Sequence, residues 1–246
     1  MIRDTQNSLA EKVADALALL KESLLQHGPL LFANSLGAED MVLTDLIWQK
    51  GLNIDVASID TGRLPVETLA LMTQIEQHYG QTLVRYTPEP ADVSAYVSQY
   101  GLDGFYDSVD ARKACCQARK VIPLRAALKD YRGWVTGIRS AQSPTRTRLK
   151  PVDMDPAFDR IKINPLTDWS EVEVWEYLKT HHVPYNPLHD QNYPSIGCAP
   201  CTRAVAPGED LRAGRWWWET PETKECGLHL VDGRLQRRSP PPSEIA

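Results

Sequence analysis

Short apolar runs of strand length alternate with amphipathic helical stretches over the first 180 residues, and this alternation limits the fold more than any other feature. Residues 30–33 (Leu-Leu-Phe-Ala) form the first such run. Before it, apolar residues recur at spacings of four and three from Leu9 to Leu24, which predicts an amphipathic helix that Pro29 ends. The same reasoning predicts further strands at 54–59, 82–86, 134–138 and 160–163. It predicts further helices through 43–47 and over 65–80, 90–100 and 108–131, the last with a bend at Pro123. Another helix is predicted after the capping box formed by Ser170 and Glu173.

Strands that alternate with helices of this length predict an α/β fold, with a mostly parallel sheet and helices on both of its faces. Ligands of such sheets bind beyond the carboxyl ends of the strands. The segments that begin at Ser35, Asp60 and Gly137 follow three predicted strands, so we expect them at this edge. From residue 181 onward proline is frequent, and apolar residues no longer recur at helix or strand spacing. This predicts one structural domain with two regions, an α/β region over residues 1–180 and an irregular extension over residues 181–246 that wraps it.

The composition is that of a globular protein, and it argues against several classes of function. No apolar run approaches the roughly 18 residues that a membrane span needs. Residues 1–7 lack the apolar core of a signal sequence, so we expect a cytoplasmic protein. The net charge of −5 argues against binding to nucleic acid or to an anionic membrane, both of which require a basic surface. An anionic small molecule would have to be met by a local group of Arg and Lys.

Four of the five cysteines form two pairs, Cys115-Cys116 and Cys198-Ala-Pro-Cys201. In the reducing cytoplasm such pairs favour metal binding or catalysis over disulfides. The spacing of the second pair lets both thiolates face one ion or cluster. Adjacent side chains on a helix diverge by about 100°, which would strain two ligands of one zinc ion. Four thiolates match the ligand count of an iron–sulfur cubane, so we favour a cluster over zinc, over a redox pair and over buried apolar cysteines.

The fifth cysteine, Cys226, is unpaired and lies near the C-terminus between Lys224 and His229. Nearby positive charge lowers the pKa of a thiol, and the thiolate is the nucleophile, although Glu225 acts in the opposite direction. Taken alone, a surface cysteine without a role is the simpler interpretation. On a mobile C-terminal segment, however, a lone thiol could visit a buried substrate and an external reductant in turn.

Basic residues gather in the sequence around these cysteines. Lys120 follows Cys116 by one helical turn, and Arg212 and Arg215 lie between the second pair and the fifth cysteine. Arginine usually belongs to the solvated surface, but this grouping in an acidic protein predicts capture of a compact polyanion. Residues 35–40 open a helix after a strand, where backbone amides attract phosphate, but a plain strand–helix turn is the simpler interpretation of that segment. Further polar candidates follow the fourth strand, namely Arg139, Gln142, Ser143, Arg146, Arg148 and Lys150.

Taken together, these motifs resemble the assimilatory adenylyl-sulfate (APS) reductases of the APS/PAPS reductase family. The resemblance covers nearly the whole chain, from about residue 30 to residue 230. Leu36 is a departure from the family pattern, because many relatives have a smaller residue there. The segments that carry the resemblance are the two cysteine pairs, residues 35–40, 59–63 and 136–139, and the Lys-Glu-Cys-Gly-Leu-His segment at 224–229.

The resemblance implies an adenine-nucleotide α-hydrolase-like fold and a [4Fe–4S] cluster on Cys115, Cys116, Cys198 and Cys201. It implies that Cys226 attacks the sulfur of APS and releases AMP, and that a dithiol protein, thioredoxin or a glutaredoxin-like protein, then releases sulfite. The residues implied to face the phosphosulfate are Lys120, Arg212, Arg215 and His229. The residues implied to hold the nucleotide are Ser35, Gly37, Asp60, Thr61, Gly62, Arg63, Gly137, Arg139 and Arg146.

Three alternatives stay open. Reduction of the 3′-phosphorylated nucleotide (PAPS) is the nearest, although many PAPS-specific relatives lack the cluster cysteines. A tRNA-thiolating ATP pyrophosphatase would share the fold, but such an enzyme should have the motif Ser-Gly-Gly-x-Asp-Ser after the first strand. This chain has Ser-Leu-Gly-Ala-Glu-Asp there, at residues 35–40. A zinc-stabilised nucleotide-binding module without activity would give Cys226 no role. The sequence also leaves open whether the protein forms a homo-oligomer.

Overall fold

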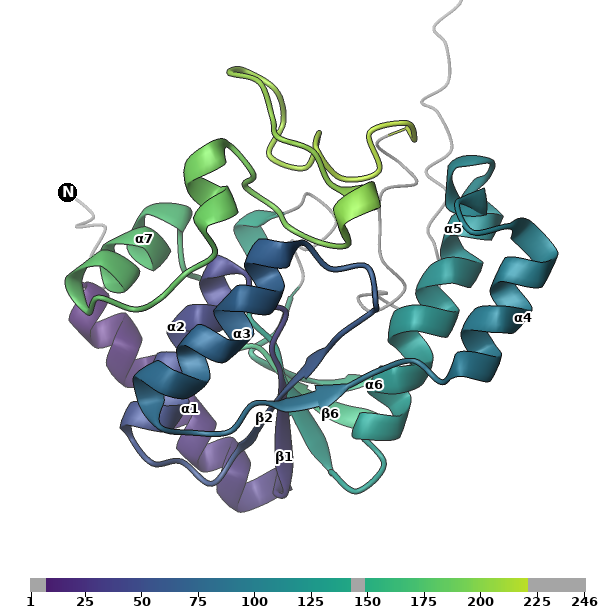
Figure 1. The fold of residues 1–246 in the computed structure, drawn as a ribbon. Helices are drawn as coiled ribbons and strands as arrows, with labels where there is room; N and C mark the ends of the chain where they lie inside the picture. Colours follow the sequence, from purple (N-terminus) through teal and green to yellow (C-terminus); the bar gives the residue numbers. More distant parts are fainter. Residues whose placement is uncertain (1–7, 143–148, 221–246) are drawn as a thin grey trace, which may run out of the picture.

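The computed structural model describes residues 8–142 and 149–220, which form a six-stranded sheet between helices (Figure 1). The strand order is β3-β2-β1-β4-β6-β5, and all neighbours are parallel except β5 and β6. The predicted fold class is confirmed. The strands are β1 (Leu30–Ala33), β2 (Asp55–Ile59), β3 (Val84–Tyr86), β4 (Gly133–Val135), β5 (Val152–Asp155) and β6 (Arg160–Ile163). The main helices are α1 (Leu9–His27), α2 (Ala38–Gln49), α3 (Val66–Tyr79), α4 (Pro90–Tyr100), α5 (Val109–Cys116), α6 (Ile122–Ala127) and α7 (Glu171–Thr180).

Alternate residues of the central strands supply two separate cores. Leu30 and Phe32 of β1 belong to the larger core, which also contains buried residues of α1, α2, α3 and α7. Leu31 of β1 and Trp134 of β4 point to the other face and pack against α6. Because both faces of these strands are covered, their sequences read as continuous apolar runs.

Helices α1 and α7 each begin at a local sequence signal, and they contact one another. The predicted capping box before α7 is present, with the N–H of Glu173 donating to Ser170 Oγ at 3.2 Å and Glu173 Oε2 accepting from the N–H of Ser170 at 2.7 Å. The same carboxylate also accepts from Lys12 Nζ of α1 at 2.8 Å. This contact joins α1 to α7 across the surface of the larger core.

The helix predicted over 108–131 runs without a break from Val109 to Ala127, and its winding changes ahead of Pro123. After α5, residues Gln117–Val121 form a π-helical turn, and α6 follows. Proline has no N–H to donate to the carbonyl four residues earlier, and its ring crowds that carbonyl. The chain therefore winds more widely ahead of Pro123. The regular part of α5 ends at Cys115 and Cys116, so the tandem cysteines sit at the change of winding.

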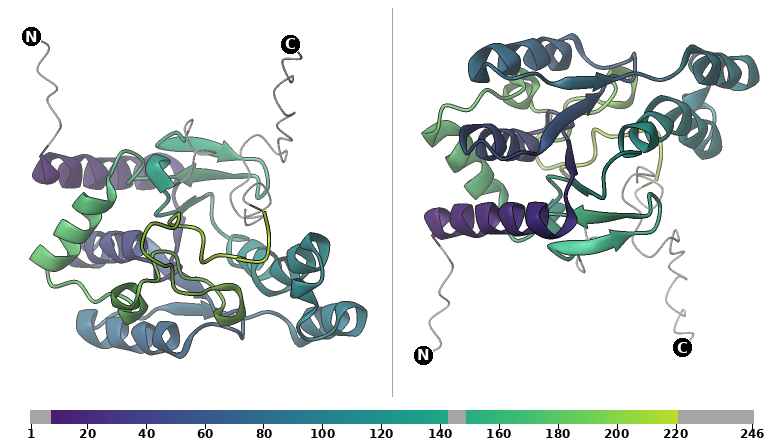
Figure 2. Two further views of the ribbon diagram at one scale, coloured as in Figure 1. Left: turned by 90° about the horizontal axis from the view of Figure 1, so that it is seen from above. Right: turned by 90° about the horizontal axis from the view of Figure 1, so that it is seen from below.

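Residues 181–220 are largely irregular and cross above the carboxyl ends of the strands (Figure 2). This described stretch contains the short 3-10 helices Pro187–Gln191 and Ala199–Cys201. One strand, β5, was not predicted; its Met154 is exposed, and it pairs only with β6 at the edge of the sheet. Among the described helices, none has the length and apolar character that crossing a bilayer requires.

Candidate active site

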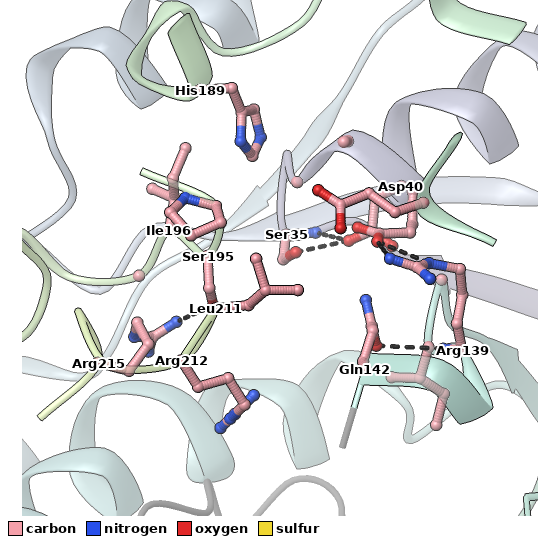
Figure 3. A pocket seen from close by; sticks show the side chains of 18 of the residues that line it. Ser35, Asp40, Arg139, Gln142, His189, Ser195, Ile196, Leu211, Arg212 and Arg215 are labelled. Carbon is pink, nitrogen blue, oxygen red and sulfur yellow. Dashed lines mark hydrogen bonds and ion pairs between the residues drawn. The ribbon is translucent and has the colours of Figure 1, made fainter. Parts of the chain in front are cut away.

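A cavity of about 910 Å³ lies at the carboxyl ends of β1, β2 and β4, beneath the irregular chain that follows α7 (Figure 3). Small-molecule sites usually measure about 300–1,000 Å³, so this cavity is large enough for a nucleotide. It lies at the edge of the sheet where the sequence predicted it. The residues singled out in the sequence that line it are Ser35, Gly37, Lys120, Gly137, Arg139, Gln142, Arg212 and Arg215.

The loop between β1 and α2 is organised by the carboxylate of Asp40. The backbone N–H and the hydroxyl of Ser35 both donate to Asp40 Oδ2, at 2.6 Å each. The next residue, Leu36, has a left-handed φ of 63°, which is uncommon for a residue other than glycine. Its side chain is buried in the larger core, and its N–H donates to Asn34 Oδ1 at 2.6 Å. The departure noted at Leu36 is therefore accommodated by the core, and the side chain does not line the cavity.

Asp40 itself is buried beneath this loop. Burial raises the pKa of its carboxyl to about 6, above the ordinary 3.8, although the hydrogen bonds from Ser35 and from the N–H of Gly137 favour the charged form. Negative charge on Glu39 adds to the rise. The carboxylate that orders the loop is thus held ionised at neutral pH by its hydrogen bonds, at an energetic cost to the folded state.

This environment predicts a pH-dependent contribution to stability. Because the pKa of Asp40 is raised on folding, its contribution is greatest below about pH 4 and is lost as the pH rises through about 6, by up to about 3 kcal/mol. Replacing Asp40 with Asn should flatten that part of the pH profile of the free energy of unfolding, measured by urea titration. Asp130→Asn, at an exposed position, is the matched control. An unchanged profile in Asp40→Asn would contradict the assignment.

Gly137, after β4, lies against the start of α2. A Cβ there would collide with Asp40 Oδ1 and lie 3.1 Å from the backbone nitrogen of Asp40. Gly137→Ala should therefore push β4 and α2 apart and destabilise the fold by about 1–3 kcal/mol. Urea unfolding measures this effect. A wild-type free energy of unfolding would show that the contact is looser than the geometry indicates.

Arg139 lies on the side of the cavity opposite Arg212 and Arg215 (Figure 3). Its Nη2 and Nε lie 2.7 and 2.8 Å from Glu39 Oε1, and its Nη1 donates to the carbonyl of Trp169 at 3.3 Å. The guanidinium is buried and its charge is already balanced by Glu39. In this arrangement Arg139 braces the loop after β4 against α2.

The opposite side of the cavity carries the basic residues predicted to meet an anion. Arg215 lies over the ring of Trp216, with 4.7 Å from its guanidinium carbon to the ring centre, and its Nη1 donates to Ser195 Oγ at 3.4 Å. A Cβ on Gly197 would collide with this guanidinium, so the glycine permits its close approach. Lys120 reaches the same region from the π-helical turn after α5. Two chain segments far apart in sequence thus place positive charge on one wall.

A smaller cavity adjoins this wall, and all four paired cysteines line it. Cys115 and Cys116 come from the end of α5, while Cys198 and Cys201 flank a 3-10 turn. The hydroxyl of Thr61 lies 3.1 Å from Cys198 Sγ. The structure therefore brings the two pairs together, as the sequence predicted. Lys120, Arg215 and Trp216 line both cavities.

The donor set of the smaller cavity fits a thiolate-ligated cluster. Burial raises the pKa of Cys201 to about 12, so this thiol would ionise at neutral pH only with a compensating cation such as a metal. Two buried N–H groups, Nε of Arg119 and Nε1 of Trp216, have no hydrogen-bond partner among the described residues. Sulfur atoms of a cluster accept such bonds. Within residues 8–142 and 149–220, no three Cys, His, Asp or Glu side chains converge closely enough to hold a single metal ion.

Residues 60–63, which follow β2, lie beside the cysteines and do not line the larger cavity, although the next residue, Leu64, does. Thr61 and Arg63 line the smaller cavity, and the carbonyl of Arg63 accepts from the N–H of Ala199 at 2.7 Å. Gly62 has a left-handed φ of 70°, and its N–H donates to Asp60 Oδ1 at 2.9 Å, which closes the turn. These contacts support the cysteine loop. Cys226, His229 and Arg146, together with the neighbouring Ser143 and Arg148, lie outside the described residues.

Several residues of the site are not singled out by the sequence. Trp216 would by default belong to a core, yet it lines both cavities. Arg119 is the neighbour of the predicted Lys120, and its Nη1 donates to the carbonyl of Thr61 at 2.9 Å. His189 lines the larger cavity, and burial lowers the pKa of its imidazole. Of these residues, only Arg119 could have been predicted from the local sequence, because it lies three positions after Cys116 and next to the predicted Lys120.

The fold and this arrangement define a class: α/β proteins with a nucleotide-sized cavity next to a four-cysteine centre. The phosphoadenosine phosphosulfate reductase domain matches residues 29–204. The chain is 57% identical over 223 residues to the adenosine 5′-phosphosulfate reductase of Allochromatium vinosum, covering 91% of this chain and 87% of that protein. It is 47% identical to the protein of that name from Neisseria meningitidis serogroup A, covering 92% of this chain and 93% of that one. The chain belongs to the APS/PAPS reductase family.

Solved structures agree with this fold. The phosphate complex of phosphoadenylyl-sulfate reductase from Candida auris superposes with a TM-score of 0.66 at 24% identity, covering 83% of this chain and 99% of that one. An NMN synthetase from Francisella tularensis gives a TM-score of 0.54 at 15% identity, covering 73% of each chain. At these identities the likeness describes the arrangement of strands and helices alone.

Proposed function

We propose that the protein reduces adenosine 5′-phosphosulfate (APS) to sulfite and AMP in assimilatory sulfate reduction, in the cytoplasm. The observation that carries the proposal is the shared wall of the two cavities, where Lys120 and Arg215 lie between the space for a nucleotide and the four cysteines. Relatives up to 57% identical bear the name of this activity.

The larger cavity suits the substrate in shape and charge. The loop after β1 and the start of α2 line one side of the cavity, where they would hold the nucleoside part of APS. On the opposite side, Arg212 and Arg215 would meet the phosphosulfate group (Figure 3). A nucleotide spanning the cavity would thus present its sulfate beside Lys120. Phosphate is a good leaving group, so the protein has mainly to position the attack and neutralise charge.

The chemistry assigned to Cys226 is a displacement in two stages. Its thiolate attacks the sulfate sulfur of APS; a sulfur–sulfur bond forms, the sulfur–oxygen bond breaks, and its electron pair leaves on the phosphate of AMP. One thiolate of a dithiol protein, thioredoxin or a glutaredoxin-like protein, then attacks the sulfur of Cys226, and sulfite leaves with the electron pair of the sulfur–sulfur bond. The second thiol of the reductant then attacks the mixed disulfide so formed, which closes a disulfide within the reductant and releases Cys226 as a thiolate. The dithiol therefore supplies both electrons.

A [4Fe–4S] cluster on Cys115, Cys116, Cys198 and Cys201 would supply a fixed charge and a rigid frame beside Lys120, without a change of oxidation state. The protein itself contributes the wall that the two cavities share, which includes Lys120, Arg215 and Trp216. Arg215 is held over Trp216, and Lys120 stands on the turn directly after the tandem cysteines. The guanidinium of Arg215 is therefore held beside the cysteines, and the backbone that carries Lys120 continues directly from Cys116.

Anaerobic purification followed by two assays tests the proposal. The same sample is examined for iron, sulfide and optical spectrum, and for sulfite release from APS with reduced thioredoxin. PAPS serves as the second substrate, because the matched domain carries the name of that nucleotide. Sulfite from APS in preference to PAPS is the expected result. Release of sulfite from neither nucleotide would refute the function, and preference for PAPS would correct the substrate.

A further inference from the structure

Residues 202–216 form a loop that closes on itself beside the larger cavity. At its base, Thr202 pairs with Arg215 in an antiparallel bridge, and the N–H of Arg203 donates to the carbonyl of Gly214 at 3.0 Å. A Cβ on Gly214 would collide with the carbonyl of Arg203, so the glycine permits this close approach.

The base of the loop is fixed by buried contacts. Trp216 has a left-handed φ of 42°, a conformation that persists in a non-glycine residue only when the surroundings impose it, and its N–H donates to the carbonyl of Cys201 at 3.2 Å. Three residues later, Glu219 accepts from Nε and Nη2 of Arg112, in α5, at 2.7 and 2.9 Å. These two side chains are only 3% and 1% exposed. The tip of the loop differs, because residues 206–211 are exposed.

An ion pair closes the exposed tip. Nη1 and Nη2 of Arg203 donate to the two carboxylate oxygens of Glu209 at 2.9 Å each, and the N–H of Ala206 donates to the same carboxylate at 2.8 Å. The N–H of Glu209 in turn donates to the carbonyl of Ala206 at 3.1 Å, which closes a turn with Pro207 and Gly208 at its middle positions. Gly208 has a left-handed φ of 89°, and proline followed by glycine favours a type II turn. We call the pair of Arg203 and Glu209 the clasp.

The clasp holds the segment that carries Arg212. Arg203 binds Gly214 through its backbone and Glu209 through its side chain, so residues 210–213 are held at both ends by one residue. The side chain of Arg212 lines the larger cavity (Figure 3). The direction in which Arg212 enters the cavity therefore depends on the clasp.

Neither stability nor charge accounts for the clasp. The side chains of Arg203 and Glu209 are 38% and 35% exposed, and exposed ion pairs usually contribute little to the free energy of unfolding. Glu209 also lines the larger cavity, where a carboxylate would repel an anionic ligand. A negative charge at this place is explained if its hydrogen bonds orient the loop.

We propose that the clasp is a positioning device, which holds Arg212 ready to bind the phosphosulfate end of the nucleotide. The inference rests on the proposed function, which places that end of APS beside Arg212. Without the clasp, the side chain of Arg212 would have to be ordered when the ligand binds. Ordering one long side chain costs about twofold to tenfold in affinity.

The test measures the binding of ADP and of adenosine to the purified protein by calorimetry. ADP carries a β-phosphate in place of the sulfate of APS, and adenosine lacks the anionic end altogether. The variants are Glu209→Ala and Glu209→Asp, the second of which keeps the charge but shortens the side chain. The matched control is Glu76→Ala. Glu76 also accepts from an arginine, Arg85, and from a backbone N–H, that of Leu83, but it lies outside both cavity linings.

Both Glu209 variants should bind ADP about twofold to tenfold more weakly than wild type, while adenosine affinity stays unchanged. An effect of charge alone would have a different sign, because Glu209→Ala would then bind ADP more tightly and Glu209→Asp would bind it as wild type does. In an Arg212→Ala background, Glu209→Ala should weaken ADP binding no further, because the residue through which the clasp acts is then absent.

ADP binding at wild-type strength or tighter in either Glu209 variant overturns the inference. An equal loss of adenosine binding overturns it as well, and so does a loss of ADP binding that persists in the Arg212→Ala background. A wild-type protein that binds ADP no more tightly than adenosine instead contradicts the proposed function on which the inference rests.

Discussion

Replacing Cys226 with serine should reduce sulfite formation from APS by at least about a thousandfold, while AMP affinity and iron content stay at wild-type values. A serine hydroxyl is almost entirely protonated at neutral pH and is a much weaker nucleophile than a thiolate. The other four cysteines all line the smaller cavity, so none of them is placed to substitute. A sulfite assay with reduced thioredoxin, on protein purified without oxygen, gives the comparison.

The control for this experiment is the variant protein itself. Retained iron absorbance shows that the four-cysteine centre is intact, and retained AMP binding shows that the larger cavity is formed. Sulfite produced by Cys226→Ser at the parental rate would refute the assignment of the nucleophile. It would leave the fold and the family membership untouched.

Cys116→Ala should have the opposite profile, with loss of iron, of sulfide and of visible absorbance, and loss of activity as a consequence. Three remaining thiols leave one corner of a cubane without a protein ligand. The site also loses the residue at which the regular helix gives way to the wider turn. Elemental analysis and the optical spectrum of anaerobically purified protein measure the effect.

Cys226→Ser, purified in parallel, is the matched control, because it also removes one thiol but should keep the metal. Comparison of the two variants therefore distinguishes a nucleophilic cysteine from cysteines that bind metal. Full cluster absorbance and full activity in Cys116→Ala would contradict the ligand set. Zinc in place of iron and sulfide in the wild-type protein would contradict the cluster itself.

Local patterns were sufficient for most of the fold. Each central strand is a short apolar run because both faces are buried, and the capping box at Ser170 acts within four residues. Two features escaped this reasoning. β5 contains Asp153 and Met154 with no periodic signal, and it depends on β6 for its hydrogen bonds. The π-helical turn before Pro123 depends on how the chain relieves the missing N–H, which the sequence alone does not determine.

Some residues of the candidate site could also be predicted from local sequence, and others could not. Lys120 could be placed beside Cys116 because one helical turn separates them, and the structure puts both on the smaller cavity. Glu219 and Arg112 are 107 positions apart, and nothing in the local sequence links them. The left-handed Trp216 likewise depends on contacts that exist only in the folded protein. The roles of Cys226, His229 and Arg146, which lie beyond the described residues, stay predictions.

The wall that both cavities share has a thermodynamic consequence. Lys120, Arg215 and Trp216 contribute to each, so occupation of one cavity alters the surroundings of the other. Linkage then requires reciprocity: if the proposed cluster tightens nucleotide binding by some factor, bound nucleotide must tighten binding of the cluster by the same factor. In that case, AMP should raise the chelator concentration that is needed to remove half of the iron at equilibrium.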